Sequence, residues 1–205
     1  ARFGVGTLGS SVATGARSVA DALSLADDDG TTLADHLEAI GFAGEADLDP
    51  SSWEAFLELH VEQGTRLESA GATVGVVDEI TGITNCAVEV RGEADHAGST
   101  PMAERSDASV AAAVFVVAVE AVAADVAADR PTAVATVGRQ TVEPNVRNIV
   151  PGRVAMEMDV RDVDHGTMDR LVERFRDRLD LIEDARPVET SLDRFRDDAP
   201  SHLSD

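Results

Sequence analysis

The order of hydrophobic patterns along residues 83–195 is the feature that most restricts the fold of this 205-residue chain. Segments in which apolar and polar residues alternate predict strands, and segments with apolar residues three to four positions apart predict helices. The expected elements are strands at 83–91, 132–142, 153–161 and 188–195, and helices at 104–128 and 167–182. This βαββαβ order predicts a ferredoxin-like unit, in which a four-stranded sheet carries both helices on one face.

The strand expected at 153–161 has one apolar and one polar face. The apolar side chains are those of Val154, Met156, Met158 and Val160, and the polar ones are those of Arg153, Glu157, Asp159 and Arg161. Because the helices would cover the apolar face, we expect Arg161 on the opposite face. A matching apolar stripe on the helix at 167–182 consists of Met168, Leu171, Val172, Phe175, Leu179 and Ile182.

Residues 1–79 show a different pattern, which we interpret as half of an α/β domain that cannot complete its own sheet. The expected elements are short strands at 2–8 and 73–77, helices at 18–26 and 33–40, a buried strand (alternatively a helix) at 53–61, and a helical turn at 65–70. Thr32 would cap the second helix, and Gly71 would end the turn. The fold class is therefore α/β, with an incomplete domain at 1–79, a complete small domain at 80–196 and a truncated connection at 197–205.

The charge of the chain restricts its partners and its surroundings. There are 39 acidic and 17 basic residues, and every basic residue is Arg, which gives a net charge of −22. An acidic surface without Lys suggests a cytoplasmic protein of a high-salt organism, because concentrated salt screens repulsion between carboxylates. The alternative is an acidic protein without salt adaptation. Such a charge argues against nucleic acid and against anionic membranes as partners.

The termini and the apolar runs indicate no membrane or secretory segment. No signal sequence is visible at the start, and the longest apolar run, Val110–Val119, is too short to span a bilayer. The single cysteine, Cys86, excludes an internal disulfide. The chain opens Ala-Arg-Phe without Met, so we expect a fragment or a processed product.

The first chemically informative motif is Glu58-Leu59-His60-Val61-Glu62-Gln63-Gly64. On a strand, Glu58, His60 and Glu62 would point the same way, and a neutral imidazole is a good ligand for zinc, manganese or nickel. The alternative is a histidine at a strand end with solvated acidic neighbours. The other histidines, His36, His165 and His202, show no metal-ligand spacing with another His, Cys, Asp or Glu.

Two later motifs surround the remaining candidates. His96 lies in the turn Asp95-His96-Ala97-Gly98-Ser99-Thr100-Pro101-Met102, whose small residues allow a substrate to approach the backbone. Asn148 and Arg161 flank the Pro151-Gly152 turn, and a guanidinium matches a carboxylate in shape. The alternatives are an exposed loop histidine and a surface arginine that pairs with Asp159 or Asp162 for little energy.

In this order the three motifs, from Arg2 to about Phe195, resemble those of the N-carbamoyl-L-amino-acid hydrolase, allantoate amidohydrolase and β-ureidopropionase group, which belongs to the M20-type metal-dependent hydrolases. The resemblance implies that residues 80–196 are an inserted lid that mediates dimerisation. It implies His60 as a metal ligand and Gln63 beside the substrate. His96 would stabilise the tetrahedral intermediate, often in the partner subunit's site, and Arg161 would bind the substrate carboxylate with Asn148 donating beside it.

The resemblance also implies a centre of two divalent ions, zinc, manganese or nickel, in each subunit. Its other ligands would precede Ala1 or follow Asp205, so the chain alone is not expected to bind metal tightly or to turn over. The expected activity is hydrolysis of a carbon–nitrogen bond in a carbamoyl amino acid, allantoate or β-ureidopropionate by a metal-activated water. The alternatives are an inactive chain that keeps only the dimerisation role, and part of an M20-type peptidase or aminoacylase.

Overall fold

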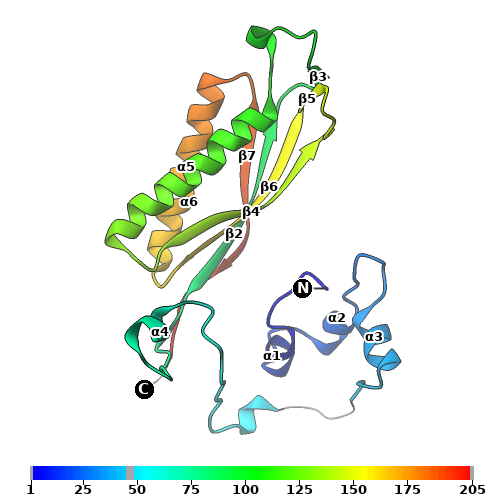
Figure 1. Ribbon diagram of the computed structural model, residues 1–205. Coiled ribbons are helices and arrows are strands. Elements are labelled where there is room, and N and C mark those ends of the chain that lie inside the picture. The colour runs from blue at the N-terminus through cyan, green and yellow to red at the C-terminus, as the bar shows by residue number, and fades with distance from the viewer. Residues whose placement is uncertain (1, 45–48, 204–205) are drawn as a thin grey trace. The chain divides into compact units, whose positions relative to one another are not determined.

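The structure is a computed structural model that describes residues 2–44 and 49–203 (Figure 1). The chain divides into two compact units, residues 1–71 and 72–205, and each is described by itself. Together they form a mixed α/β protein with several sheets, as the sequence predicted at this level.

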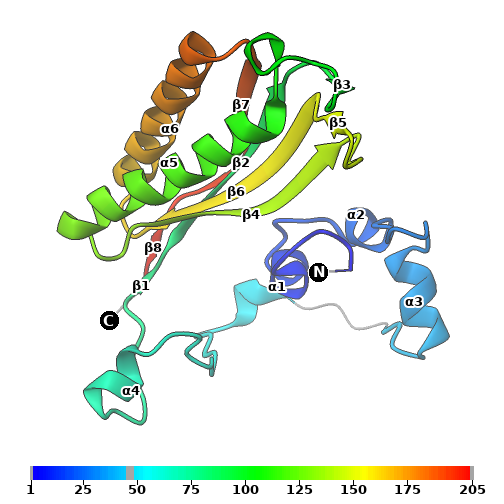
Figure 2. The same cartoon turned by 45° about the horizontal axis from the view of Figure 1, so that its top comes forward.

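The second unit is built around one antiparallel sheet. Its elements are β2 (Gly82–Arg91), α5 (Ala108–Asp129), β4 (Val134–Glu143), β6 (Arg153–Asp162), α6 (His165–Ala185) and β7 (Glu189–Asp198). The strand order is β4-β6-β2-β7, and all three pairs are antiparallel. Both long helices lie on the same face of this sheet, which leaves the other face open (Figure 2). All six elements had been expected, within a few residues of these bounds.

The alternation of side chains explains why one face is covered. Val154, Met156, Met158 and Val160 of β6 are buried beneath the helices, as the sequence predicted. The expected apolar stripe of α6 is also buried, and Phe115 of α5 and Phe175 of α6 are completely inaccessible to solvent. The core therefore lies between the helices and the sheet.

The starts of the two long helices are fixed by acidic caps. Asp107 accepts hydrogen bonds from the backbone N–H of Ser109 and Val110, so α5 begins at Ala108 and the predicted start at residue 104 was wrong. Residues 102–104 form a separate 3-10 turn, η2 (Met102–Glu104). Asp164 caps α6 in the same way, through the backbone N–H of Thr167 at 2.9 Å.

By length and composition alone α5 could cross a membrane, but it packs on the sheet through Phe115 and six smaller residues.

Two small sheets complete the second unit. β1 (Glu79–Ile80) pairs with β8 (Ser201–His202), and β3 (Asp95–His96) pairs with β5 (Ile149–Val150). Residues 197–203, expected to be an unfinished connection, thus contain the end of β7 and the strand β8.

The first unit consists of short helices joined by irregular segments. They are α1 (Leu8–Ala13), α2 (Val19–Leu23), α3 (Leu33–Ala39), the 3-10 turn η1 (Pro50–Ser52) and α4 (Arg66–Ala70). The predicted cap of α3 is confirmed, because the Thr32 and Asp35 side chains form a reciprocal capping box. The helical turn at 66–70 ends at Gly71, also as expected.

The strands expected at 2–8, 53–61 and 73–77 were wrong, because these segments form no strand here. Leu57 and Leu59, expected to be buried, are 95% and 96% exposed. A strand forms when its backbone N–H and C=O groups find a neighbouring strand. Among the described residues, no strand lies beside these segments, so they form no ladder and are mostly irregular.

Candidate functional site

The pairing of β3 with β5 brings two of the predicted site residues together. His96 lies opposite Ile149 in this ladder, and the backbone N–H of Ala97 donates to the carbonyl oxygen of Asn148 at 2.9 Å. His96 and Asn148, which are 52 positions apart in the sequence, are therefore neighbours at one end of the second unit. Figure 1 shows this end, where β3 and β5 meet beyond the main sheet.

The turn after His96 fixes which nitrogen of its ring carries the proton. The backbone N–H of Gly98 donates to Nδ1 of His96 at 3.1 Å, so Nδ1 is an acceptor. A neutral ring then carries its hydrogen on Nε2, and the side chain is exposed. A Cβ at position 98 would lie 3.0 Å from Cε1 of His96, so a larger residue there would press on the ring, which lies over the turn. The geometry presents one N–H donor to a ligand.

The His96 turn is closed by further hydrogen bonds. The carbonyl oxygen of His96 accepts from the backbone N–H of Thr100 at 3.0 Å and from its hydroxyl at 2.9 Å. The Asp95 carboxylate accepts from the backbone N–H of His96 at 2.7 Å. This hydrogen bond, with one from the Thr100 side chain, lowers the pKa of Asp95, so the carboxylate stays ionised as an acceptor.

Arg161 lies on the open face of the sheet, as expected, but at the other end. It is opposite Ile83 of β2 and Val134 of β4. Its guanidinium forms a bidentate pair with Asp159, from Nε to Oδ1 at 2.6 Å and from Nη2 to Oδ2 at 3.1 Å. The hydrogen bond to Asp159 raises the pKa of Arg161. A carboxylate thus already occupies the fork in the geometry that a substrate acid would use.

The length of β6 separates Arg161 from the His96 turn. β6 begins at Arg153, directly after β5 and the Pro151-Gly152 turn, and Arg161 is eight residues further along. At a rise of about 3.3 Å per residue this is roughly 26 Å. Within one chain, His96 and Asn148 therefore form one group, and Arg161 is separate from it.

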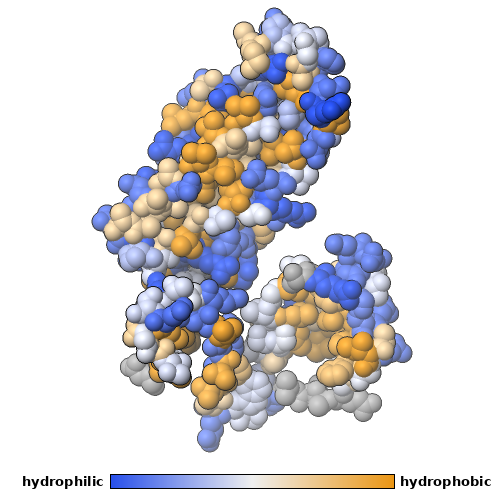
Figure 3. All heavy atoms as spheres, in the orientation of Figure 1, coloured by the Kyte–Doolittle hydropathy of each residue, from blue (hydrophilic) through white to orange (hydrophobic). Residues whose placement is uncertain are grey.

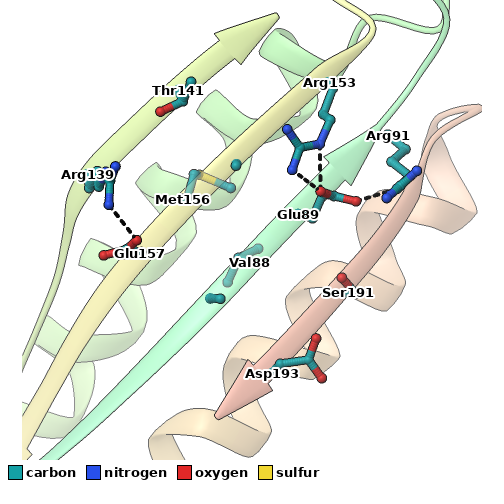
Figure 4. Close-up of a pocket in the computed structure, with 12 residues that line it drawn as sticks. Val88, Glu89, Arg91, Arg139, Thr141, Arg153, Met156, Glu157, Ser191 and Asp193 are labelled. Atoms are coloured by element: carbon teal, nitrogen blue, oxygen red, sulfur yellow. Dashed lines mark hydrogen bonds and ion pairs between the residues drawn. The ribbon is translucent and has the colours of Figure 1, made fainter. Parts of the chain in front are cut away.

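The open face carries ion pairs between neighbouring strands that the sequence did not predict. A hollow of about 550 Å³ lies over the sheet, with Glu89, Arg139, Arg153 and Glu157 among its lining residues (Figure 4). Arg153 donates through Nε to Glu89 at 2.6 Å, and Arg139 donates to Glu157 at 2.9 Å. The Arg153 guanidinium lowers the pKa of Glu89. The alternation of charges on β2, β4 and β6 was the signal for these ion pairs.

His60 lies in the first unit beside an acidic neighbour. Its Nδ1 is 2.7 Å from Oε1 of Glu58, and both side chains are exposed. A histidine that donates through Nδ1 to a carboxylate leaves Nε2 free to bind a metal. Glu62 points elsewhere, because its carboxylate accepts from the backbone N–H groups of Arg66 and Leu67, each at 2.9 Å. The expectation that Glu58, His60 and Glu62 share one direction thus holds for the first pair only. Gln63 is exposed.

A three-residue group of possible metal ligands occurs in the second unit, at His165, Asp169 and Asp197. The statement that His165 lacks metal-ligand spacing was therefore wrong, because Asp169 follows one turn later on α6 and β7 brings Asp197 close. Arg194 already lies between the two carboxylates, with Nη1 2.8 Å from each. Hydrogen bonds from Thr84 and Arg194 lower the pKa of Asp197. The guanidinium offsets part of the charge of the two carboxylates, so the group is explained as an ion-pair network.

The fit of a catalytic metal to the described residues depends on His60. A catalytic zinc site commonly has about three protein ligands. In the described part of the first unit, His60 and Glu58 form no group of three possible ligands with another residue. Their arrangement suits one ligand with its supporting carboxylate, and the remaining ligands would have to come from other residues.

Comparison with known proteins gives one family and many relatives. The M20 peptidase dimerisation domain matches residues 79–185. An N-carbamoyl-L-amino-acid amidohydrolase of Paenarthrobacter aurescens is 35% identical over 208 residues, which cover 100% of this chain and 50% of that protein. A ureidoglycolate hydrolase of Arabidopsis thaliana is 32% identical over 213 residues, covering 100% of this chain and 44% of the relative. The chain spans about half the length of the curated relatives it matches.

Solved structures show the same relationship. A hydantoinase/carbamoylase family amidase from Burkholderia vietnamiensis has a TM-score of 0.83 and 34% identity, covering 99% of this chain and 48% of that one. The structure of AtUAH in complex with glyoxylate has a TM-score of 0.79 and 30% identity, covering 98% of this chain and 49% of the other.

Proposed function

Because the chain belongs to the M20-type carbamoylase family of amidases, we propose that it is part of an amidohydrolase that cleaves a carbon–nitrogen bond of an N-carbamoyl amino acid or a ureido acid. Relatives named N-carbamoyl-L-amino-acid amidohydrolase and ureidoglycolate hydrolase support this substrate class. In the structure, the observation that carries the proposal is the His96 turn, which presents a single N–H donor from an exposed ring.

His96 would act on the oxygen that becomes negative during the reaction. Attack on the carbamoyl carbon places negative charge on its oxygen, and a preorganised donor stabilises that charge. The Gly98 N–H holds Nδ1 as an acceptor, so Nε2–H is the donor available for this oxygen. The small residues of the turn leave room for the substrate.

Arg161 would bind the carboxylate of the substrate at its α-carbon. The bidentate pair with Asp159 is compatible with this role, because its geometry is the one that a substrate carboxylate would take, although the same pair is expected of a surface arginine. A substrate acid would displace or share Asp159. Asn148 would donate to the substrate from the His96 turn, and Gln63 would lie beside the substrate, as in the resembled group.

The separation of about 26 Å along β6 has a consequence for assembly. One small acid cannot contact both Arg161 and the His96 turn of the same chain. We therefore place Arg161 of one copy and His96 with Asn148 of a second copy at each active site. The protein would then be an obligate homodimer for catalysis.

The surface for this dimer would be the outer face of α5, in a lid domain that we propose to be ferredoxin-like. Val110, Val114 and Val117 are 43%, 41% and 64% exposed, and with Ala113 they line a shallow apolar hollow. Figure 3 shows apolar side chains gathered over this helix. β4 lies at the edge of the sheet and pairs only with β6 among the described strands. Exposed apolar patches of this kind commonly mark interfaces.

His60 would be one ligand of a divalent metal, zinc, manganese or nickel, with Glu58 orienting its ring. When bound, such a metal lowers the pKa of a water and polarises a carbonyl. We also propose adaptation to high salt and a cytoplasmic location, on the basis of the net charge of −22 and the absence of Lys.

Replacement of Arg161 tests the substrate class. The assay uses the longest polypeptide that the gene encodes, with N-carbamoyl amino acids as substrates. Arg161→Ala should raise KM strongly, by roughly a hundredfold for the loss of a charge-assisted bidentate contact. Arg139→Ala is the matched control, because Arg139 lies on the same face and pairs with Glu157. Unchanged turnover in Arg161→Ala would refute the carboxylate-binding role.

The alternative is a non-catalytic protein that keeps only the dimerisation role. It is favoured by the metal ligands of the first unit, where no three possible ligands come together among the described residues. Metal analysis of the purified protein discriminates between the two. A stoichiometric, tightly bound divalent ion that is lost in His60→Ala would argue for the enzyme.

A further inference from the structure

We infer that Arg105 is a positioning residue that holds the His96 turn in the conformation that presents Nε2–H, an inference that rests on the proposed role of His96. Arg105 follows the turn in sequence, between η2 and the start of α5. Its guanidinium donates through Nη2 to the carbonyl oxygen of Ala97 at 2.6 Å and through Nε to that of Thr100 at 3.1 Å. Two bonds from one rigid group therefore join both sides of the turn.

The two carbonyls are the ones that decide the shape of the turn. Ala97 directly follows His96, and Thr100 closes the turn through its bonds to the His96 carbonyl. The Gly98 N–H that fixes the ring lies between them. If the Ala97 and Thr100 carbonyls moved apart, the Gly98 N–H would lose its direction toward Nδ1. The imidazole could then exchange between its two tautomers.

The choice of Arg has a physical reason. A guanidinium is a planar fork with donors at fixed positions, whereas an ammonium is a point charge on a flexible stem. Arg105 is half-buried, and its charge helps to lower the pKa of Asp95, but among the described residues no hydrogen bond joins its guanidinium to a carboxylate. Its hydrogen bonds go to neutral carbonyls instead, which is what a role in shaping the backbone requires.

The residue that follows Arg105 is hydrogen-bonded to the chain at the end of β2. The carbonyl oxygen of the adjacent Ser106 accepts from the backbone N–H of Glu93 at 2.9 Å, and the N–H of Gly92 donates to the Gly152 carbonyl at 2.8 Å. A Cβ on Gly92 would lie 2.1 Å from the Ser106 carbonyl oxygen, so the two backbones cross here in close contact. Arg105 thus reaches the exposed turn from a rigid base.

Nitrogen-15 NMR of the histidine rings in the 205-residue chain tests this inference directly. The His96 signals, assigned with His96→Ala, should report one tautomer with hydrogen on Nε2. In Arg105→Ala they should report a mixture, and exchange of the Gly98 amide should accelerate by about tenfold or more, as expected for the loss of hydrogen bonds from a charged group. Arg105→Lys should restore the single tautomer only in part, because an ammonium lacks the fork.

The matched control is Arg147→Ala, which removes the same charge from the neighbouring exposed loop, beside Asn148. It should leave the His96 tautomer unchanged. An unchanged tautomer and unchanged Gly98 exchange in Arg105→Ala would overturn the inference, and so would equal changes in Arg147→Ala. If Arg105→Ala does not fold, Arg105→Lys decides: wild-type His96 signals in that variant would overturn the requirement for a fork.

Kinetics separate this inference from the proposed function. In the longest polypeptide that the gene encodes, Arg105→Ala should lower kcat by about tenfold, and it should add little when His96 is already Ala, because residues that act through one another are not additive. Equal losses in both backgrounds would overturn the positioning role. If no amidohydrolase activity is found, the proposed function fails, while the NMR result still decides whether Arg105 holds the turn.

Discussion

Both units of this chain contain segments rich in apolar residues, yet only in the second unit do such segments form a four-stranded sheet. In the second unit, β2 and β6 run side by side for ten residue pairs, and the helices cover their apolar face. In the first unit, residues 53–61 have apolar side chains as well, but Leu57 and Leu59 are almost fully exposed. An apolar segment therefore forms a strand only where a neighbouring strand satisfies its backbone N–H and C=O groups.

The largest expected difference between the units is the loss of unfolding free energy when an apolar side chain is removed. Phe175→Ala, at a fully buried position of α6, should lower the free energy of unfolding by about 3–5 kcal/mol, because it leaves a cavity in the core. Leu59→Ala, at a position that is 96% exposed, should change it by less than about 0.5 kcal/mol. Urea unfolding followed by circular dichroism measures the first effect.

Trp53, the only tryptophan of the chain, offers a separate fluorescence probe, because it lies in the first unit. Phe175→Ala should shift the circular dichroism transition without moving the Trp53 signal to the same extent. A large loss of stability in Leu59→Ala would show that residues 53–61 are packed in solution. The two units would then not differ in the burial of their apolar segments.

The second prediction concerns the exposed apolar surfaces within the second unit. Val117→Asp on the outer face of α5 should weaken the dimer by at least about thirtyfold, because a charge would be buried at the centre of the proposed interface. Leu181→Asp on α6 is the matched control, since Leu181 is also exposed, at 55%, but lies on the other helix. Sedimentation velocity across a range of concentrations measures both. A dimer that is weakened by Leu181→Asp and not by Val117→Asp would place the interface on α6.

Several features of both units could be predicted because the information that determines them is local. The burial of Met156 and Met158 follows from alternation along a single strand, and the capping box of Thr32 follows from residues three positions apart. The face on which Arg161 lies could be predicted for the same reason. Each of these features is determined within one element or between adjacent elements.

The remaining features depend on partners that are distant in the sequence. From the sequence alone, Asn148 and Arg161 could be placed only on either side of the Pro151-Gly152 turn, whereas the pairing of β3 with β5 brings the backbone of Asn148 beside the His96 turn. The cluster of Arg153 with Glu89 joins two strands that are 64 positions apart. The prediction of a strand at 53–61 was wrong because apolar content does not reveal whether a neighbouring strand exists. A pattern within one segment contains no information on register, and register decides which side chains meet.

The smallest expected effect is a dependence of the stability of the second unit on pH. Arg153 lowers the pKa of Glu89, so the ionised carboxylate stabilises the folded second unit. This contribution is fully present above the ordinary pKa of glutamate, near 4.5, and is lost as the pH falls through the lower folded value. Glu89→Gln should therefore be less stable than the wild type at neutral pH, by about 1 kcal/mol or less for a pair that water partly screens, and this difference should shrink below about pH 4. Urea midpoints of the circular dichroism transition at both pH values measure it.

Glu58→Gln in the first unit, where the carboxylate is exposed beside His60, should leave that transition unchanged at either pH. If Glu89→Gln kept the wild-type midpoint at neutral pH, the open face of the sheet would contribute nothing to stability, and the core beneath the helices alone would distinguish the second unit from the first.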